Sequence, residues 1–140
     1  MKQIPVIFWT GTGNTQMMAD AVAEAINAAG AEAVVKNVSE ITADEAAGYD
    51  ALALGCPAMG AEVLEECEFE PFFTDLEGKL AGKKVALFGS YGWGGSYMQD
   101  WEARVKDAGA TLVADGVLAL GAPDDEAMAK LAEAGKLLAE

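Results

Sequence analysis

The sequence has no histidine among its 140 residues and only two cysteines, Cys56 and Cys67. Imidazole is the side chain that most often carries protons and binds metals near neutral pH, so its absence disfavours a hydrolase or a metalloenzyme. Two cysteines at this spacing are too few for a zinc site. We interpret both as ordinary thiols, because disulfides are rare in cytosolic proteins.

Long apolar runs are missing as well. Hydrophobic residues make up 52% of the chain, but no stretch approaches the roughly 18 apolar residues of a membrane helix. Residues 1–9 have no small-residue cleavage site and lead into a Gly/Thr loop, so we interpret them as a strand and not as a signal peptide. We therefore expect a cytoplasmic protein without membrane contact. A length of 140 residues fits a single domain, residues 1–140.

Basic residues are few, with 9 Lys and Arg against 23 Asp and Glu and a net charge of −14. This balance disfavours nucleic acid and anionic membranes, since Lys and Arg are what bind their phosphates. An acidic surface would instead steer the molecule toward basic patches on partner proteins, with a strong dependence on salt. The alternative interpretation is that the acidic surface mainly provides solubility.

What the chain does contain is an alternation of strand and helix patterns. Short apolar runs typical of buried strands lie at residues 4–9, 33–35, 51–55, 85–88 and 111–120. Helical patterns lie at residues 18–29, 42–48 and 98–108 and after Pro123, where Met128, Leu131, Gly135 and Leu138 are expected to face inward. This alternation, without a repeat or a linker, predicts an open, doubly wound parallel sheet covered on both faces. We expect regular pairing of the first strand to begin at Val6, because Pro5 cannot donate within a ladder.

Three loops that follow predicted strands have an unusual composition: residues 10–15, 56–62 and 90–95. In an open parallel sheet, ligands bind beyond the carboxyl ends of the strands, at the point where the strand order reverses. We therefore expect all three loops to face the same ligand.

The first loop, Thr10-Gly11-Thr12-Gly13-Asn14-Thr15, joins a buried strand to a helix. Its glycines let backbone N–H groups converge, its threonines add hydroxyl donors, and the helix contributes the positive end of its dipole. Such a loop would bind a phosphate with uncharged donors only. The alternative is an ordinary turn with a helix cap, because Thr and Asn cap helices routinely.

Other phosphate motifs do not match. A nucleotide P-loop needs a Lys after its last glycine, and residues 10–18 contain none. A dinucleotide fingerprint needs Gly or Ala where Gln16 stands. A phosphatase of this architecture would have an Arg six positions after its Cys, but Glu62 follows Cys56 and Phe73 follows Cys67 at that distance. A phosphoacceptor domain would have acidic residues at the end of the first strand, which here ends in Trp9-Thr10. A monophosphate site without magnesium chemistry remains.

Three segments of the chain resemble the FMN-binding segments of short-chain flavodoxins of the clostridial type. They are Trp9-Thr10-Gly11-Thr12-Gly13-Asn14-Thr15, Leu54-Gly55-Cys56-Pro57-Ala58-Met59-Gly60 and Leu87-Phe88-Gly89-Ser90-Tyr91-Gly92-Trp93-Gly94, and the likeness continues through residues 68–72 and 83–86. The resemblance implies the flavodoxin-like α/β fold, a doubly wound open sheet of five parallel strands in order 2-1-3-4-5 with helices on both faces. Flavodoxin itself is a standard example of this strand order and of a site at its switch point, so both are taken from the family and not worked out from the sequence.

The resemblance also implies which residues bind FMN. Residues 10–15 would hold its phosphate, Met59 and Trp93 would cover the two faces of the ring, and Glu62 would accept a hydrogen bond from the flavin N3–H. A thioether and an indole both pack well against an aromatic ring. The full set of expected cofactor-binding residues is Trp9, Thr10, Gly11, Thr12, Gly13, Asn14, Thr15, Pro57, Ala58, Met59, Gly60, Glu62, Ser90, Tyr91, Gly92, Trp93 and Gly94. No catalytic residue and no metal ligand is expected.

The function implied is that of a low-potential one-electron carrier, which shuttles its FMN between the semiquinone and hydroquinone states and turns over no substrate of its own. Its partners would be redox proteins with basic docking patches, such as ferredoxin-type oxidoreductases and reductases, and the chain would be a monomer. Glu62 and the following carboxylates at positions 65, 66, 68 and 70 would oppose the second reduction by their charge. The other interpretation of this acidic run is a solvated surface loop.

Two rival functions stay open at this point. One is a small FMN-dependent reductase acting on quinone or nitro acceptors, and the other is a binding module that kept the fold and lost the flavin. Departures from the family pattern bear on the fine tuning of the reduction potentials and not on the identity of the cofactor. Ala61, Gly95 and Gly121 stand where relatives often have polar residues, and Pro57 offers no hydroxyl.

Overall fold

The computed structural model describes residues 2–11, 13–58, 64–91 and 96–140. Its elements in chain order are β1 (Gln3–Phe8), α1 (Asn14–Ala28), β2 (Glu32–Asn37), the 3-10 turn η1 (Val38–Glu40), α2 (Ala43–Ala46), β3 (Ala51–Gly55), α3 (Phe69–Glu77), β4 (Lys84–Tyr91), α4 (Ser96–Asp107), β5 (Thr111–Leu112), β6 (Val117–Leu120) and α5 (Asp125–Ala139). Several expected site residues lie outside the described ranges: Thr12, Met59, Gly60, Glu62, Gly92, Trp93 and Gly94, together with Ala61 and Gly95.

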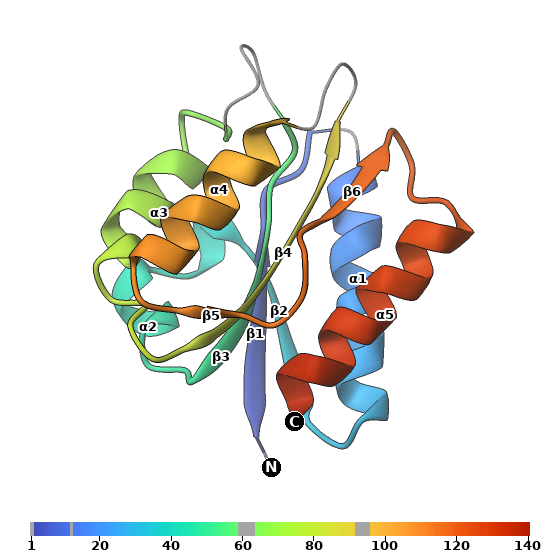
Figure 1. The fold of residues 1–140 in the computed structure, drawn as a ribbon, viewed down its shortest axis with the longest axis horizontal. Coiled ribbons are helices and arrows are strands. Elements are labelled where there is room, and N and C mark those ends of the chain that lie inside the picture. The colour runs from blue at the N-terminus through green and yellow to red at the C-terminus, as the bar shows by residue number, and fades with distance from the viewer. Residues whose placement is uncertain (1, 12, 59–63, 92–95) are drawn as a thin grey trace.

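The described strands form one parallel sheet in the order β2-β1-β3-β4-β5, and β6 also pairs with β4 (Figure 1). The strand order implied by the family resemblance is confirmed. The predicted last strand, residues 111–120, is split into β5 and β6. The Gly116 N–H, between them, donates to Glu102 Oε2 of α4 at 2.7 Å, and a Cβ at Gly116 would overlap the Met98 sulfur. The chain therefore leaves the ladder where it passes close beneath α4.

Pro5 has different effects on the two sides of β1. On the β3 side, regular pairing begins with Val6 opposite Ala53, as predicted. On the β2 side, pairing begins at Gln3, and Pro5 stands in register with Val34. The expectation that pairing begins at Val6 is therefore right for one neighbour and wrong for the other.

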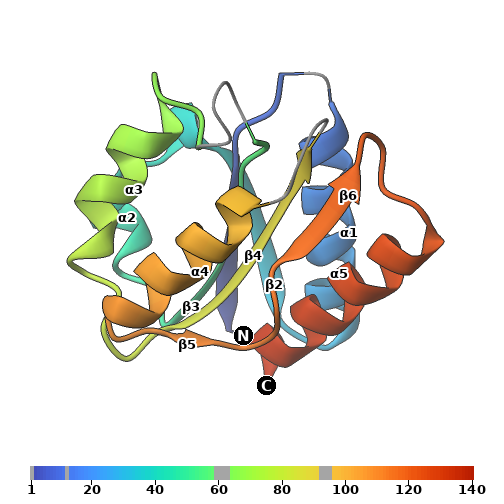
Figure 2. The same cartoon turned by 45° about the horizontal axis from the view of Figure 1, so that its top comes forward.

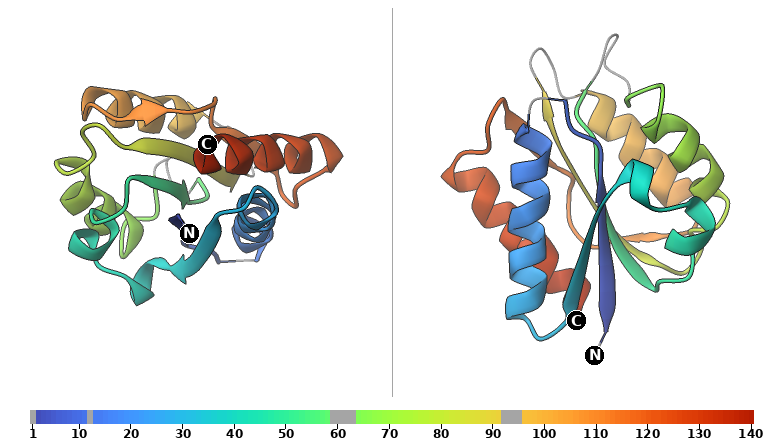
Figure 3. Two further views of the ribbon diagram at one scale, coloured as in Figure 1. Left: turned by 90° about the horizontal axis from the view of Figure 1, so that it is seen from below. Right: turned by 180° about the vertical axis from the view of Figure 1, so that it is seen from behind.

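Helices cover both faces of the sheet, with α1 and α5 on one side and α2, α3 and α4 on the other (Figures 1 and 3). Alternate residues of each strand point to opposite faces of the sheet. Ala51 and Ala53 of β3 face α1 and α5, as do the larger Phe8 of β1 and Phe88 of β4. On the opposite face, Leu52 and Leu54 of β3 and Leu87 of β4 pack against α3 and α4.

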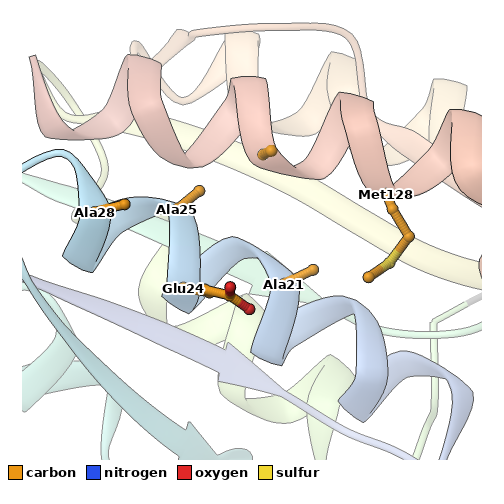
Figure 4. A pocket seen from close by; sticks show the side chains of 6 residues that line it. Ala21, Glu24, Ala25, Ala28 and Met128 are labelled. Carbon is orange, nitrogen blue, oxygen red and sulfur yellow. The ribbon is translucent and has the colours of Figure 1, made fainter.

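The helices α1 and α5 cross closely. A Cβ at Gly135 of α5 would lie 2.7 Å from the Val22 carbonyl oxygen of α1, so only glycine fits there without a shift. Leu131, Gly135 and Leu138 face inward as predicted. Met128 does not, because its side chain is 40% exposed at the edge of a groove between α1 and α5 (Figure 4).

The helix α3 is absent from the sequence-based prediction. Its apolar residues Phe69, Phe72, Phe73 and Leu76 follow the i, i+3, i+4, i+7 spacing that would have indicated it. All four are buried against the larger residues of the sheet and against α4. Nine residues are a short window for recognising a helix, and the side chain that caps this one lies four positions before it.

A charged cluster joins α3 to α4. Arg104 donates to Glu70 at 2.7 and 2.9 Å and to Glu77 at 3.1 Å, and its guanidinium lies 4.7 Å from the centre of the Phe73 ring. The hydrogen bonds from Arg104 hold the pKa of the Glu70 carboxyl below its usual value, against the opposing effect of burial. In the part of the chain that the structure describes, no helix is long and apolar enough to cross a membrane.

We predict that Arg104→Met lowers the free energy of unfolding by about 1 kcal/mol at pH 7, because the two-pronged pair is only partly screened by solvent. A depressed carboxyl pKa stabilises the fold above the unfolded value of about 4.3 and stops doing so as the pH falls through the folded pKa. The difference from the wild type should therefore shrink in acid. Urea titrations from pH 7 to pH 3 measure this.

The matched control is Lys130→Met, which removes a cation whose partner Glu126 and own side chain are both well exposed. It should change stability by no more than a few tenths of a kcal/mol. Equal effects of the two substitutions would show that the Arg104 cluster contributes no more than an ordinary surface pair.

Candidate functional site

The carboxyl ends of β1, β3 and β4 meet at one end of the sheet, opposite the end where the chain termini lie (Figures 1 and 2). Backbone hydrogen bonds continue past the strands and join the first residues of the three loops. Trp9 N–H donates to the Gly55 carbonyl at 3.0 Å, Cys56 N–H to that of Phe88 at 3.1 Å, and Ala58 N–H to that of Ser90 at 3.0 Å. The starts of the three loops therefore keep the spacing of neighbouring strands.

The first loop ends in a helix whose N-terminus faces this edge. Gly13 is the N-cap of α1 and has a φ of 92°, a conformation that favours glycine. Its N–H donates to Thr10 Oγ1 at 2.9 Å, which draws the loop into a tight turn. For the described residues, no side chain caps the helix and its first turn has no acidic residue. The N–H groups at the start of α1 and the positive end of its dipole thus suit an anion.

A hydroxyl pair joins the first loop to the third. Thr15 Oγ1 lies 3.3 Å from Ser90 Oγ, and the two residues are 1% and 7% exposed. A buried hydroxyl without a partner costs free energy, so each side chain orients the other. This contact holds the first and third loops next to each other, although Thr15 and Ser90 are 75 positions apart in the sequence.

Trp9 lies between the first loop and the turn that precedes α3. A Cβ at Gly11 would be 3.2 Å from the Trp9 ring, so the indole packs directly against the loop backbone. On its other side, Trp9 Nε1 donates to Glu68 Oε1 at 3.2 Å. The ring therefore has contacts both in the predicted phosphate loop and in the acidic run.

The second loop starts from a tightly packed base at Cys56. Tyr97 donates its hydroxyl to the Cys56 carbonyl at 2.8 Å, and a Cβ at Gly89 would overlap both groups. Burial raises the pKa of the Cys56 thiol to about 12, helped by the negative charges of Glu65 and Glu70 and only partly offset by a backbone hydrogen bond from Glu65. Cys56 is thus a packing residue and an acceptor. Both cysteines are free thiols, as expected.

The burial of Glu65 differs from the interpretation of the acidic run as a solvated surface loop. It is 6% exposed, and its carboxylate accepts from the backbone N–H groups of Cys67, Glu68 and Phe69 at 2.7–2.9 Å. Burial by itself would raise its pKa, but these hydrogen bonds, with one from the Cys67 thiol, lower it below the usual value. The sequence contains one signal for this role: Glu65 stands four positions before the apolar i, i+3, i+4, i+7 pattern that begins at Phe69, within reach of the first N–H groups of a helix there.

The structure brings together the expected site residues that lie in its described ranges. These are Trp9, Thr10, Gly11, Gly13, Asn14, Thr15, Pro57, Ala58, Ser90 and Tyr91. Tyr91 is partly buried and packs toward the α3 and α4 side of the sheet. Its carbonyl accepts the N–H of Gly121 at 3.1 Å, which places that departure from the family pattern beside the third loop.

A parallel sheet in this order defines a doubly wound α/β protein, and its uncharged first loop lies at the strand ends, where such folds bind phosphate-bearing cofactors. The sequence profile described as Flavodoxin matches residues 6–135. The chain therefore belongs to the flavodoxin family.

Individual relatives agree with this assignment. The flavodoxin of Clostridium beijerinckii is 47% identical over 135 residues, which cover 96% of this chain and 97% of that protein. The flavodoxin of Megasphaera elsdenii is 47% identical over 116 residues, or 82% of this chain and 85% of that protein. A solution structure of the two-electron reduced Megasphaera protein has a TM-score of 0.90 at 44% identity and covers 97% of this chain and 98% of that one. This similarity places the chain with the short-chain, clostridial type.

FMN is accordingly the cofactor, and electron transfer is the role that the family defines. The described residues fit the cofactor chemically. Residues 10–15 carry no charged side chain, and the helix start beside them has no acidic residue that would repel a phosphate. Small or apolar residues, Pro57 and Ala58, open the second loop next to Ser90.

We predict that Thr15→Val weakens FMN binding about two- to tenfold, because it removes one buried hydroxyl and leaves that of Ser90 without this partner. A flavin fluorescence titration of the apoprotein measures the dissociation constant. Thr111→Val, at an exposed position of β5, makes the same chemical change away from the site and should leave binding unaltered. Unchanged affinity in Thr15→Val would mean that the hydroxyl pair does not shape the loop.

Proposed function

We propose that this protein is a low-potential carrier of single electrons, which works between the half-reduced and fully reduced states of its FMN. Bound FMN supplies the capacity to accept and release electrons one at a time. The protein supplies the binding site and the electrostatic environment. The observation that carries the proposal is an uncharged Gly/Thr loop at the strand ends of a strongly acidic protein, followed by a helix start without acidic residues.

We propose that residues 10–15 bind the phosphate through backbone N–H groups and hydroxyls. Gly13 holds the loop in a left-handed turn, and the Thr15–Ser90 pair keeps it next to the third loop. Neutral donors at a helix start stabilise a phosphate by direct hydrogen bonds and by the helix dipole. No lysine or arginine is needed there, so the loop adds no full positive charge that would favour extra electrons nearby.

The electrostatic environment favours a low potential. The net charge is −14, and carboxylates at 65, 66, 68 and 70 follow directly on the second loop. A unit charge at about 8 Å and an effective dielectric of ~20 opposes a new negative charge by roughly 2 kcal/mol. For a one-electron step this corresponds to roughly 90 mV, since about 1.4 kcal/mol equals ~59 mV. A few such groups therefore make the second reduction difficult.

The remaining proposals follow from the same role. The ring contacts are Met59 and Trp93, with Glu62 at the flavin N3–H and with Gly60, Gly92 and Gly94 allowing close approach; these residues, and Thr12 of the phosphate loop, lie outside the described ranges. Partners would be redox enzymes that present basic docking patches to the acidic surface. We propose a single-domain monomer that acts in the cytoplasm and turns over no substrate of its own.

The proposal is tested by a reductive titration of the protein loaded with FMN. We expect one FMN per chain and two separate one-electron steps, the second at the lower potential. Failure to bind FMN would contradict the proposal outright. Steady-state turnover of a quinone or nitro compound with saturable kinetics would instead favour a reductase.

We further predict that Glu62→Gln makes the second potential less negative, by up to roughly 90 mV, because it removes one negative charge near the ring. The control is Glu24→Gln, which makes the same charge change about 15 Å from the start of α1, at an exposed position that lines the groove between α1 and α5 (Figure 4). Screening should keep the effect of the control small. A shift to a more negative potential in Glu62→Gln would refute the electrostatic explanation.

A further inference from the structure

The turn of residues 65–69, between the second loop and α3, is organised by one buried carboxylate. Glu65 Oε1 accepts from Glu68 N–H at 2.7 Å and from Phe69 N–H at 2.9 Å, while Oε2 accepts from Cys67 N–H at 2.8 Å. The Glu65 carbonyl accepts from Glu70 N–H at 2.8 Å. These bonds give the first N–H groups of α3 the partners that its N-cap residue does not provide. The turn is therefore held in one conformation.

This turn contacts the first loop. Glu65 accepts a hydrogen bond from the backbone N–H of Glu68 and so fixes the position of the Glu68 backbone. The Glu68 side chain in turn accepts a hydrogen bond from the indole N–H of Trp9 at 3.2 Å. The Trp9 ring packs against Gly11. A sequence of direct contacts thus leads from the buried carboxylate to the phosphate loop.

The same residue also contacts the start of the second loop. Glu65 N–H donates to Cys56 Sγ at 3.3 Å. The Cys56 backbone is fixed in turn, because its N–H donates to the Phe88 carbonyl and its own carbonyl accepts from Tyr97. Glu65 therefore joins the turn that follows the second loop to Cys56, where that loop begins.

We propose that Glu65 is a positioning residue for the cofactor, which holds the first loop through Glu68 and Trp9 and the base of the second loop through Cys56 at one fixed spacing. This inference rests on the proposed function, because it assumes that both loops bind FMN. Glu65 does not itself touch the cofactor. Its effect is to keep the phosphate loop and the second loop in the geometry that binds FMN and determines its potentials.

The chemistry of the turn explains why a carboxylate is required here. Two oxygens that only accept hydrogen bonds can serve three N–H donors, whereas the amide of glutamine has one oxygen and would turn an NH₂ group toward Cys67 N–H. The single arginine of the sequence, Arg104, binds Glu70 and Glu77. Backbone N–H groups thus stabilise the charge of Glu65, and its lowered pKa keeps it ionised at neutral pH.

The test compares Glu65→Gln with Glu66→Gln in the full chain. Both remove one negative charge at neighbouring positions, but Glu66 is exposed. We expect Glu65→Gln to weaken FMN binding at least about tenfold, as for the loss of a charged acceptor from buried donors, and Glu66→Gln to leave it within about twofold. Equal dissociation constants for the two variants would overturn the proposal.

A charge-conserving variant separates geometry from electrostatics. Glu65→Asp keeps the charge and withdraws the carboxylate by one methylene. We expect it to weaken FMN binding and to shift at least one of the two reduction potentials from the wild-type value, which a general loss of stability would not do. Wild-type affinity and wild-type potentials in Glu65→Asp would show that only the charge of Glu65 matters, and would also overturn the proposal. This variant decides the matter if Glu65→Gln does not fold.

A double-mutant cycle tests the route through Trp9. Trp9→Phe keeps an aromatic ring against Gly11 and removes the N–H that binds Glu68. If Glu65 acts through this contact, the double variant Glu65→Asp/Trp9→Phe should bind FMN more tightly than the product of the two single fold-changes predicts. Strict additivity would exclude the Trp9 route. Wild-type protein that binds no FMN would refute the proposed function, whereas normal wild-type binding with silent Glu65 variants would refute this inference alone.

Discussion

The geometry of the site depends on backbone hydrogen bonds that continue beyond the ends of the parallel strands. Cys56 N–H binds the Phe88 carbonyl, and two residues later Ala58 N–H binds that of Ser90. This continuation is possible only because Gly89 has no Cβ, since one would overlap the Cys56 carbonyl and the Tyr97 hydroxyl. The first residues of the loops are therefore held at the distance between neighbouring strands. A planar cofactor with a phosphate tail needs binding residues that are fixed in this way on several sides.

Charge is distributed in a way that serves both binding and redox chemistry. Residues 10–15 carry no charged side chain, although the protein as a whole has a net charge of −14. In the function that we propose, a phosphate is bound by dipoles, while most full charges of the acidic run after the second loop are negative and disfavour further electrons. Had the phosphate been held by lysine or arginine, the same residues would have stabilised a reduced, anionic cofactor. The family of the chain shows an FMN-binding electron carrier, and the low potential that we propose follows from this distribution of charge.

The acidic run after the second loop is structural as well as electrostatic. Glu65 caps α3, Glu68 binds the Trp9 indole, and Glu70 pairs with Arg104. Three carboxylates that look alike in the sequence thus have three different partners: backbone N–H groups, the Trp9 side chain just after β1, and Arg104 of α4. Glu66 and Glu68 are exposed to solvent, whereas Glu65 is buried. The segment therefore combines solvated charges with one buried carboxylate that organises the turn.

The sequence by itself determined the alternation of strands and helices, the two-sided burial of the sheet and the uncharged loop at residues 10–15, because periodicity and glycine content are local properties of the chain. Through its resemblance to a family it also determined the cofactor and the strand order. The glycine at position 116 also indicated a bend in the last strand, which the structure divides into β5 and β6. Only the tertiary structure decided the exposure of Met128 and the burial of Glu65. The tertiary structure also decided which distant residues meet, as Thr15 meets Ser90 across 75 positions. A periodic pattern shows which face of an element is buried, but it does not show which side chain from another part of the chain becomes the partner of a polar group.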